Sequence, residues 1–241
     1  VNHIPVLEHK PVAVDRVVTL AAQLDLPIHI HIHETSAEIE ESLQLHGLRP
    51  LERLHRLGVR GPGLIGVHAA HLEEGEIRLL AKYDCSIAHC PSSNMKLASG
   101  IAPIVAMLEH GLRIGLGTDG AASNNRLDIF QEMRHAALLA KAVSGNAAAV
   151  GAHDVLRMAT LNGAAALGLA AKIGSIRAGK AADLCAVCLD TIETRPCYDP
   201  ASHLVYAAGR EQVSHVWVNG ILRLENGLLQ GCDTSQLLDT V

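Results

Sequence analysis

Apolar residues follow two different spacings along the first two thirds of the chain. Segments with an apolar residue at every third or fourth position, as in amphipathic helices, alternate with short runs that are continuously apolar or have a period of two, as in strands. Helices are predicted over 11–24, 35–47, 73–83, 101–111 and 126–143. Strands are predicted over 26–33, 63–68, 85–90 and 113–120. Strands separated by helices in this way indicate parallel βα units, in a doubly wound sheet or in a (β/α)₈ barrel.

Local signals mark the ends of two of these helices. Thr35 and Glu38 form a Thr-x-x-Glu capping box, and Gly47 closes the same helix. The chain is therefore expected to turn from strand to helix immediately after the first strand. Asn124 and Asn125 are the candidates for capping the helix over 126–143.

The pattern changes near residue 170. An Ala-rich helix is predicted over 154–169, and glycine-punctuated strand signals follow it, including a hairpin pattern with an Asn-Gly turn at 219–220. We therefore predict two domains: one with the βα units over 1–170 and a small β-rich one over 171–241.

Composition narrows the class of partner. The 241 residues are 49% apolar and carry a net charge of −5 with acids and bases interspersed, so a small molecule is expected rather than nucleic acid or a membrane surface. No apolar run approaches the roughly 18 to 20 residues of a membrane span, and the first residues lack the order of a signal peptide, which favours the cytoplasm. The six cysteines are too sparse for a disulfide framework, so reduced thiols are expected.

Cys185 and Cys188 have the spacing of half a zinc knuckle. Their sequence context, ADLCAVCL, reads as a strand, and no second pair completes the knuckle. We therefore expect these two side chains to pack in a core.

Four successive predicted strands end on residues that can bind a metal or carry a proton. These residues are His31, His33 and Glu34, then His68, then His89, then Asp119. The carboxyl ends of parallel strands converge at one mouth of a barrel, where catalytic residues lie. A lone histidine on an apolar strand is more often structural, and an Asp-Gly pair is a common turn, but neither explains the agreement of four strand ends.

Imidazole together with a carboxylate suits zinc or iron. Such a metal lowers the pKa of water from about 15.7 to about 7, and a nearby carboxylate is still needed to move protons. Strict alternation would place Glu34 on the face opposite His31. Because the capping box indicates that the backbone turns there, Glu34 can reach the mouth as the general acid/base.

Two longer stretches carry a family resemblance. HCPSSNMKLASGIAPI (89–104) and GTDGAASNNRLDIFQEMRHAALLAK (117–141) resemble the 5-methylthioadenosine/S-adenosylhomocysteine deaminases of the amidohydrolase superfamily. The resemblance runs from about residue 11 to the C-terminus. The stretch TDGAASNN is specific to this branch, whereas the His/His/Asp pattern identifies only the superfamily.

The resemblance implies one divalent metal ion, zinc or iron, with His31 and Asp119 as ligands. It implies that Glu34 shuttles a proton and touches the substrate, that His68 orients the attacking water, and that His89 lies near the reacting carbon. Asp119 would also accept a proton from water and touch the substrate. The implied reaction is hydrolytic deamination of the adenine ring of 5-methylthioadenosine or S-adenosylhomocysteine, giving ammonia and an inosine-type product. The family also implies that residues 1–170 are part of a (β/α)₈ barrel and that residues 171–241 form a small, sandwich-like β domain. It further implies a homo-oligomer acting on a small nucleoside.

The sequence departs from the family pattern at its beginning. The family's first strand carries an HxH ligand pair; His29-x-His31 or His31-x-His33 could imitate that pair, but only three strand ends follow, which fits the fifth strand. About four βα units are present, roughly half of a barrel of about 250 residues, and such a half would expose sheet edges. His29 and His33 are interpreted as supporting residues, with His33 a candidate for facing the substrate.

Two alternatives stay open. One is another aminohydrolase of the same superfamily, acting on guanine, a triazine or another N-heterocycle. The other is a metal-binding fragment without catalytic activity that pairs with another chain.

Overall fold

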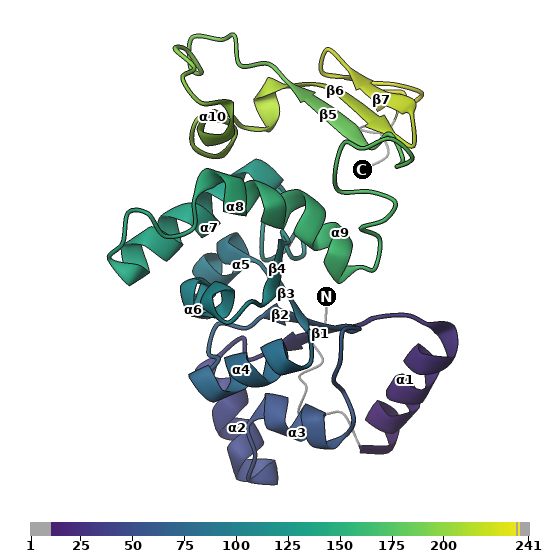
Figure 1. Ribbon diagram of the computed structural model, residues 1–241, viewed down its shortest axis with the longest axis vertical. Coiled ribbons are helices and arrows are strands. Elements are labelled where there is room, and N and C mark those ends of the chain that lie inside the picture. Colours follow the sequence, from purple (N-terminus) through teal and green to yellow (C-terminus); the bar gives the residue numbers. More distant parts are fainter. Residues whose placement is uncertain (1–10, 235, 237–241) are drawn as a thin grey trace.

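A parallel four-stranded sheet lies at the centre of the computed structural model, which describes residues 11–234 and 236 (Figure 1). Its strands pair in chain order and are β1 (Ile28–Ile32), β2 (Leu64–His68), β3 (Ser86–His89) and β4 (Arg113–Leu116). The connecting helices are α2 (Ser36–His46), α3 (Pro50–Arg56), α4 (Glu74–Lys82), α5 (Pro91–Lys96) and α6 (Ile104–Glu109), and α1 (Pro11–Leu24) precedes the sheet. The predicted βα rhythm is confirmed, and all four strand ends lie at one edge of the sheet.

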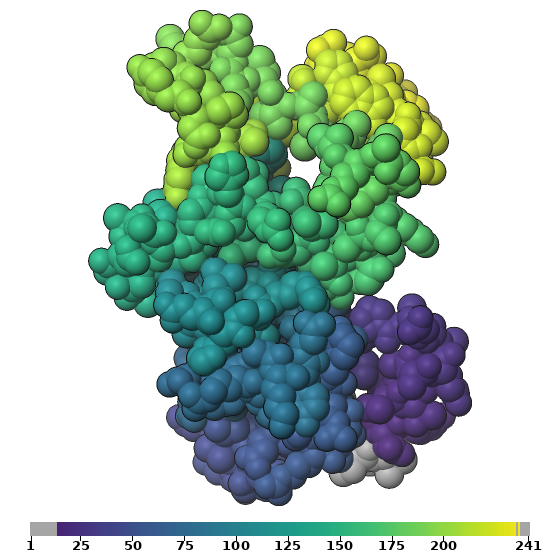
Figure 2. Space-filling model, viewed as in Figure 1, coloured from purple at the N-terminus to yellow at the C-terminus, as the bar shows by residue number. Residues whose placement is uncertain are grey.

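Longer helices follow β4. They are α7 (Ile129–Ser144), α8 (Ala152–Arg157) and α9 (Gly163–Ala166), with a π-helical turn at Met158–Asn162 between the last two. In Figure 1 they lie between the parallel sheet and a second sheet. The space-filling view shows the same succession from the N-terminal to the C-terminal part of the chain (Figure 2).

The core lies between the parallel sheet and its helices. The sheet contributes fully buried aliphatic side chains, which pack against equally buried residues of the helices: Ile32, Ile87, Ile114, Leu54, Ile77, Met107, Val155 and Met158. Burying such side chains contributes about 1.5–3 kcal/mol each. This packing holds the strand ends rigidly enough to carry a site.

The helix ends agree with the sequence in one case and differ in another. The hydroxyl of Thr35 accepts a hydrogen bond from the backbone N–H of Glu38, and Gly47 closes α2 in the left-handed region with φ 65°. The expected cap of α7 is wrong, because Asp128 accepts the N–H of Phe130 at 3.0 Å. The helix begins only after Asp128, so Asn124 and Asn125 lie in the loop that precedes it.

The second sheet is antiparallel, with strands β5 (Leu184–Val187), β6 (Val213–Val218), β7 (Ile221–Glu225) and β8 (Leu228–Leu229). Two short helices, α10 (Pro200–Tyr206) and a 3₁₀ turn at Arg210–Gln212, lie between β5 and β6. The predicted Asn219-Gly220 turn joins β6 to β7, with both residues at positive φ. The described residues contribute a single sheet here, so two stacked layers are not seen in this part.

The expectation that the two cysteines of the ADLCAVCL segment pack in a core is wrong. Cys185 and Cys188 are both exposed. All six thiols are free. Among the described residues, no helix is both long and apolar enough to cross a membrane.

Candidate active site

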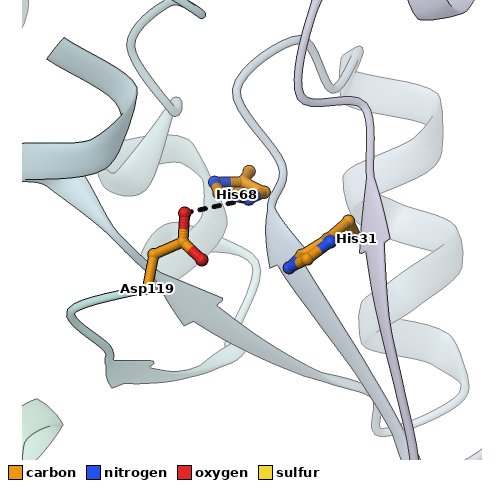
Figure 3. A group of neighbouring side chains, drawn as sticks. All are labelled: His31, His68 and Asp119. Carbon is orange, nitrogen blue, oxygen red and sulfur yellow. Dashed lines mark ion pairs between the residues drawn. The ribbon is translucent and has the colours of Figure 1, made fainter. Parts of the chain in front are cut away.

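Three side chains from the predicted strand ends meet at the carboxyl edge of the parallel sheet (Figure 3). His31 lies in β1, His68 ends β2, and Asp119 follows β4. One ligand atom of each lies within 4.8 Å of the other two. The imidazole centroids of His31 and His68 are 4.9 Å apart, and His68 Nε2 is 4.0 Å from Asp119 Oδ2. The structure therefore brings together both predicted metal ligands and the histidine predicted to orient water.

The backbone at these strand ends is strained. His33, His68, Ala69 and Asp119 all have φ between 52° and 68°, a region that non-glycine residues rarely adopt. Each such residue costs about 1–3 kcal/mol, and residues of this kind concentrate at active sites. The positive φ values direct the side chains of these residues differently from the alternation of a regular strand.

Asn94 fixes the orientation of His68. Its Oδ1 lies 2.8 Å from Nδ1 of His68, and both residues are buried. A carboxamide oxygen can only accept, so Nδ1 carries the proton. Nε2 is then the nitrogen that offers its lone pair on the side of Asp119 and Glu34.

Two serines hold Asp119. The hydroxyls of Ser93 and Ser123 donate to its Oδ2 at 2.7 and 2.6 Å. Burial alone would raise the pKa of this carboxyl, but the hydrogen bonds from Ser123 and Ser93, with smaller contributions from the Gly120 backbone and His68, hold the pKa below its usual range. Asp119 is therefore an anion, the form in which a carboxyl group can bind a metal ion.

Glu34 faces the same nitrogen of His68 as Asp119 does. Its Oε2 is 3.8 Å from His68 Nε2, and its Oε1 accepts a hydrogen bond from the hydroxyl of Ser99 at 3.3 Å. The turn after β1 makes this possible, since Glu38 accepts the backbone N–H groups of Glu34 and His33 at 2.8 and 3.2 Å. Glu38 thus accepts from the two residues before the N-cap residue Thr35. In a standard capping box the glutamate accepts from the N–H of the N-cap residue itself.

His33 does not face the substrate side, so that expectation is wrong. The residue is fully buried, its Nε2 accepts the N–H of Leu51 at 3.0 Å, and its Nδ1 lies 3.3 Å from Arg49 Nη2. Burial lowers the pKa of His33 to about 4. The positive φ directs this ring into the packing against α3. His29 is exposed on β1.

His89 is placed apart from the three-residue group. It is buried at the end of β3 and lines a cavity of about 260 Å³ together with residues of α6 and α7. Burial, with a smaller effect of His68, lowers the pKa of His89 to about 3. Its Nδ1 has no hydrogen-bond partner within the described part of the chain. Its predicted contact with the substrate stays a prediction.

Sequence reasoning missed the residues that hold the site in place. These are Ser93, Asn94, Ser99 and Ser123. They lie in the same two stretches, HCPSSNMKLASG and GTDGAASNN, that carry the family resemblance. Small polar residues in the segments that follow two strand ends were the available signal.

The donor set fits a divalent metal ion. Imidazole and carboxylate are the ligands of catalytic zinc sites, which use three protein ligands and leave one position open. His31, His68 and Asp119 offer this combination within one cluster.

Comparison with known proteins agrees with the fold. The sequence profile described as the amidohydrolase family matches residues 3–222, so the chain belongs to this family. A 5-methylthioadenosine/S-adenosylhomocysteine deaminase of Teredinibacter turnerae is 45% identical over 206 residues, which cover 86% of this chain and 47% of that protein. A 5'-deoxyadenosine deaminase of Methanothermobacter thermautotrophicus is 44% identical over 220 residues, 91% of this chain and 51% of that protein. The chain therefore spans about half the length of these relatives.

Crystal structures of similar proteins agree with the fold of this chain. An adenosine deaminase from Xanthomonas campestris with bound zinc superimposes with a TM-score of 0.94 at 48% identity, over 96% of this chain and 53% of that one. The atrazine chlorohydrolase TrzN from Arthrobacter aurescens, complexed with zinc, gives a TM-score of 0.91 at 29% identity, over 96% and 51%.

Proposed function

We propose that the protein is a metal-dependent aminohydrolase that deaminates the adenine ring of a 5′-substituted adenosine, 5-methylthioadenosine or S-adenosylhomocysteine. The observation that carries the proposal is the placement of Glu34 beside the His31, His68 and Asp119 cluster, with Glu34 Oε2 3.8 Å from His68 Nε2. Relatives at 42–47% identity bear deaminase names for such nucleosides. The product would be an inosine-type nucleoside and ammonia.

His31 and Asp119 would hold one divalent ion, and we propose zinc because the similar crystal structures contain it. His68 offers a third donor atom, a nitrogen, close to the same place. When bound, a zinc ion supplies the Lewis acidity that ionises water near neutral pH.

The chain's own residues divide the proton transfers. Ser99 holds Glu34 Oε1, which leaves Oε2 to carry a proton from water to a ring nitrogen of the purine. His68 Nε2 orients the water, and the Asp119 carboxylate takes its second proton. Asp119 then delivers this proton to the amino group, and the bond between that nitrogen and the attacked ring carbon breaks to release ammonia.

The parallel sheet is proposed to be half of an eight-stranded barrel, with residues 171–241 forming a separate β-rich, sandwich-like domain. Helix α9 ends at Ala166, shortly before the proposed boundary near 170. A homo-oligomer is expected, and sedimentation of the complete protein measures this directly.

Ammonia release tests the proposed reaction. The complete protein is incubated with 5-methylthioadenosine, S-adenosylhomocysteine, adenosine and guanine. Release from the adenosines, lost on chelation and restored by zinc, supports the proposal. Release from guanine alone, or from none of the three adenosines, would refute it in favour of another aminohydrolase.

The variant Glu34→Gln tests the proton carrier and the alternative of a metal-binding fragment. The amide keeps the size of the side chain but cannot carry a proton. We expect retention of the metal and loss of turnover, whereas equal turnover in variant and wild type would exclude Glu34 as the acid/base.

A further inference from the structure

Glu132 is a fully buried carboxylate on the first turn of α7. Each of its two oxygens accepts a hydrogen bond. Oε2 accepts the backbone N–H of Ser92 at 3.0 Å, and Oε1 accepts the side-chain amide of Asn124 at 2.6 Å. Both partners are themselves buried, so these bonds lie in the interior.

The two partners belong to the two segments that hold the candidate active site. Ser92 immediately precedes Ser93, which donates to Asp119, and Asn94, which contacts His68. Asn124 immediately follows Ser123, the second donor to Asp119. One carboxylate therefore binds both segments whose residues Ser93, Asn94 and Ser123 contact Asp119 and His68.

Both segments need an external anchor. Helix α5 has only six residues, and the N–H groups of a first helical turn have no acceptor inside the helix. The segment with Asn124 is a loop between β4 and α7. Helix α7 gives α5 a second contact one turn further along, between His135 Nδ1 and the hydroxyl of Ser92 at 2.9 Å.

We propose that Glu132 is a positioning residue of the active site, which sets the places of Ser93, Asn94 and Ser123 and, through them, of Asp119 and His68. This inference rests on the proposed function. It assigns Glu132 no contact with metal or substrate; its effect passes through the hydrogen bonds described above.

Two substitutions test the hydrogen bonds themselves. In Glu132→Gln, one amide donor must face either the Ser92 N–H or the Asn124 amide, so one hydrogen bond is lost. In the double variant Glu132→Gln with Asn124→Asp, the introduced amide donates to the introduced carboxylate, while its oxygen still accepts the Ser92 N–H. The double variant thus restores both hydrogen bonds and the net charge.

Metal affinity by chelator competition, kcat and KM are measured on the folded complete protein. Changes in contacts that orient metal ligands typically cost about 10- to 100-fold in affinity or activity. We expect losses of this size in metal affinity and kcat for Glu132→Gln, with KM nearly unchanged, and recovery of most of both losses in the double variant. Glu40→Gln, which removes an exposed carboxylate of α2, is the matched control and should equal wild type.

The outcomes separate the inference from the proposed function. Wild-type metal affinity and kcat in Glu132→Gln, with only the melting temperature lowered, would overturn the positioning role. A double variant no better than Glu132→Gln would overturn the hydrogen-bond account. Absence of deaminase activity in wild type would instead refute the proposed function, and metal affinity would still decide the role of Glu132. If Glu132→Gln does not fold, Asn124→Ala removes the loop bond alone and should weaken metal binding through Asp119.

Discussion

His68 and Asn94 form a buried contact of 2.8 Å between Nδ1 and Oδ1, and this contact determines which nitrogen of His68 is available on the side of Asp119 and Glu34. Histidine has two tautomers of similar energy in water, so a single acceptor at Nδ1 is enough to select one. Asn94 itself lies on α5, five residues after the end of β3. Residues outside the strand ends thus complete the chemistry of the strand ends.

Replacing Asn94 should separate the acceptor from the shape of the side chain. Asn94→Leu keeps the volume but removes the acceptor, and we expect kcat to fall about 10- to 100-fold. Asn94→Asp keeps an oxygen at Nδ1 and should lose less. Steady-state kinetics on both variants provide the measurement, and equal losses would contradict the role of the acceptor.

The two serines on Asp119 should act as a coupled pair. A hydrogen bond to a charged group contributes about 1.5–3 kcal/mol, so Ser93→Ala or Ser123→Ala should each weaken metal binding about tenfold or more. Both hydroxyls bind the same oxygen, Oδ2, so their effects should not add. Chelator competition on the single and double variants measures the coupling.

Ser144→Ala is the control for the single and double variants of Ser93 and Ser123. Its hydroxyl donates to the Ala140 carbonyl at the end of α7, away from Asp119. The variant should bind metal like wild type. Strict additivity of the Ser93 and Ser123 effects would show that the two hydroxyls act independently.

The convergence of His31, His68 and Asp119 could be predicted because it depends only on topology. Parallel strands place their carboxyl ends together, and alternation with helices makes the strands parallel. The position of Glu34 could also be inferred, since the capping residues Thr35 and Glu38 mark where the backbone turns.

The orientation of His33 could not be predicted in the same way. It depends on a left-handed backbone conformation and on an N–H from α3, two features without a periodic pattern. The short helices α3, α5 and α10 were also missed. Each is six or seven residues long, too short for a periodicity, although each begins with proline at its first position, which favours a helix start.

Gly100 should be intolerant of a side chain. Its φ is 130°, and an added Cβ would lie 2.8 Å from His71 Nε2. His71 Nε2 contacts the carbonyl oxygen of Ser99, whose hydroxyl holds Glu34. We expect Gly100→Ala to destabilise the fold by about 1–3 kcal/mol and to lower kcat by displacing Ser99.

Gly47→Ala is the matched control for Gly100→Ala. Gly47 also has a positive φ of 65°, but nothing lies within 4 Å of an added Cβ. This variant should cost about 1 kcal/mol of stability and leave kcat unchanged. Thermal unfolding and steady-state kinetics on both variants distinguish backbone strain from displacement of Ser99; an unchanged kcat in Gly100→Ala would refute the displacement.

His33 should make the fold sensitive to acid. Burial, partly offset by Glu76, lowers its pKa to about 4 from the ordinary value of 6.5. Between these two values the unfolded chain binds a proton that the folded chain does not. The free energy of unfolding therefore has its full value, as far as His33 is concerned, above pH 6.5 and falls as the pH drops toward 4. The complete shift corresponds to about 3 kcal/mol, and His89, whose pKa is also lowered, acts in the same direction.

The variant His33→Gln isolates the contribution of His33 to this acid sensitivity. Its side-chain oxygen can still accept the N–H of Leu51 but does not titrate. Urea unfolding of metal-free protein between about pH 4.5 and 7.5 should show a wild-type stability that falls faster with acidification than that of the variant. The free-energy difference between wild type and variant should therefore shrink as the pH falls. Parallel curves would mean that His33 is protonated equally in the folded and unfolded states, which its burial and the Leu51 hydrogen bond argue against.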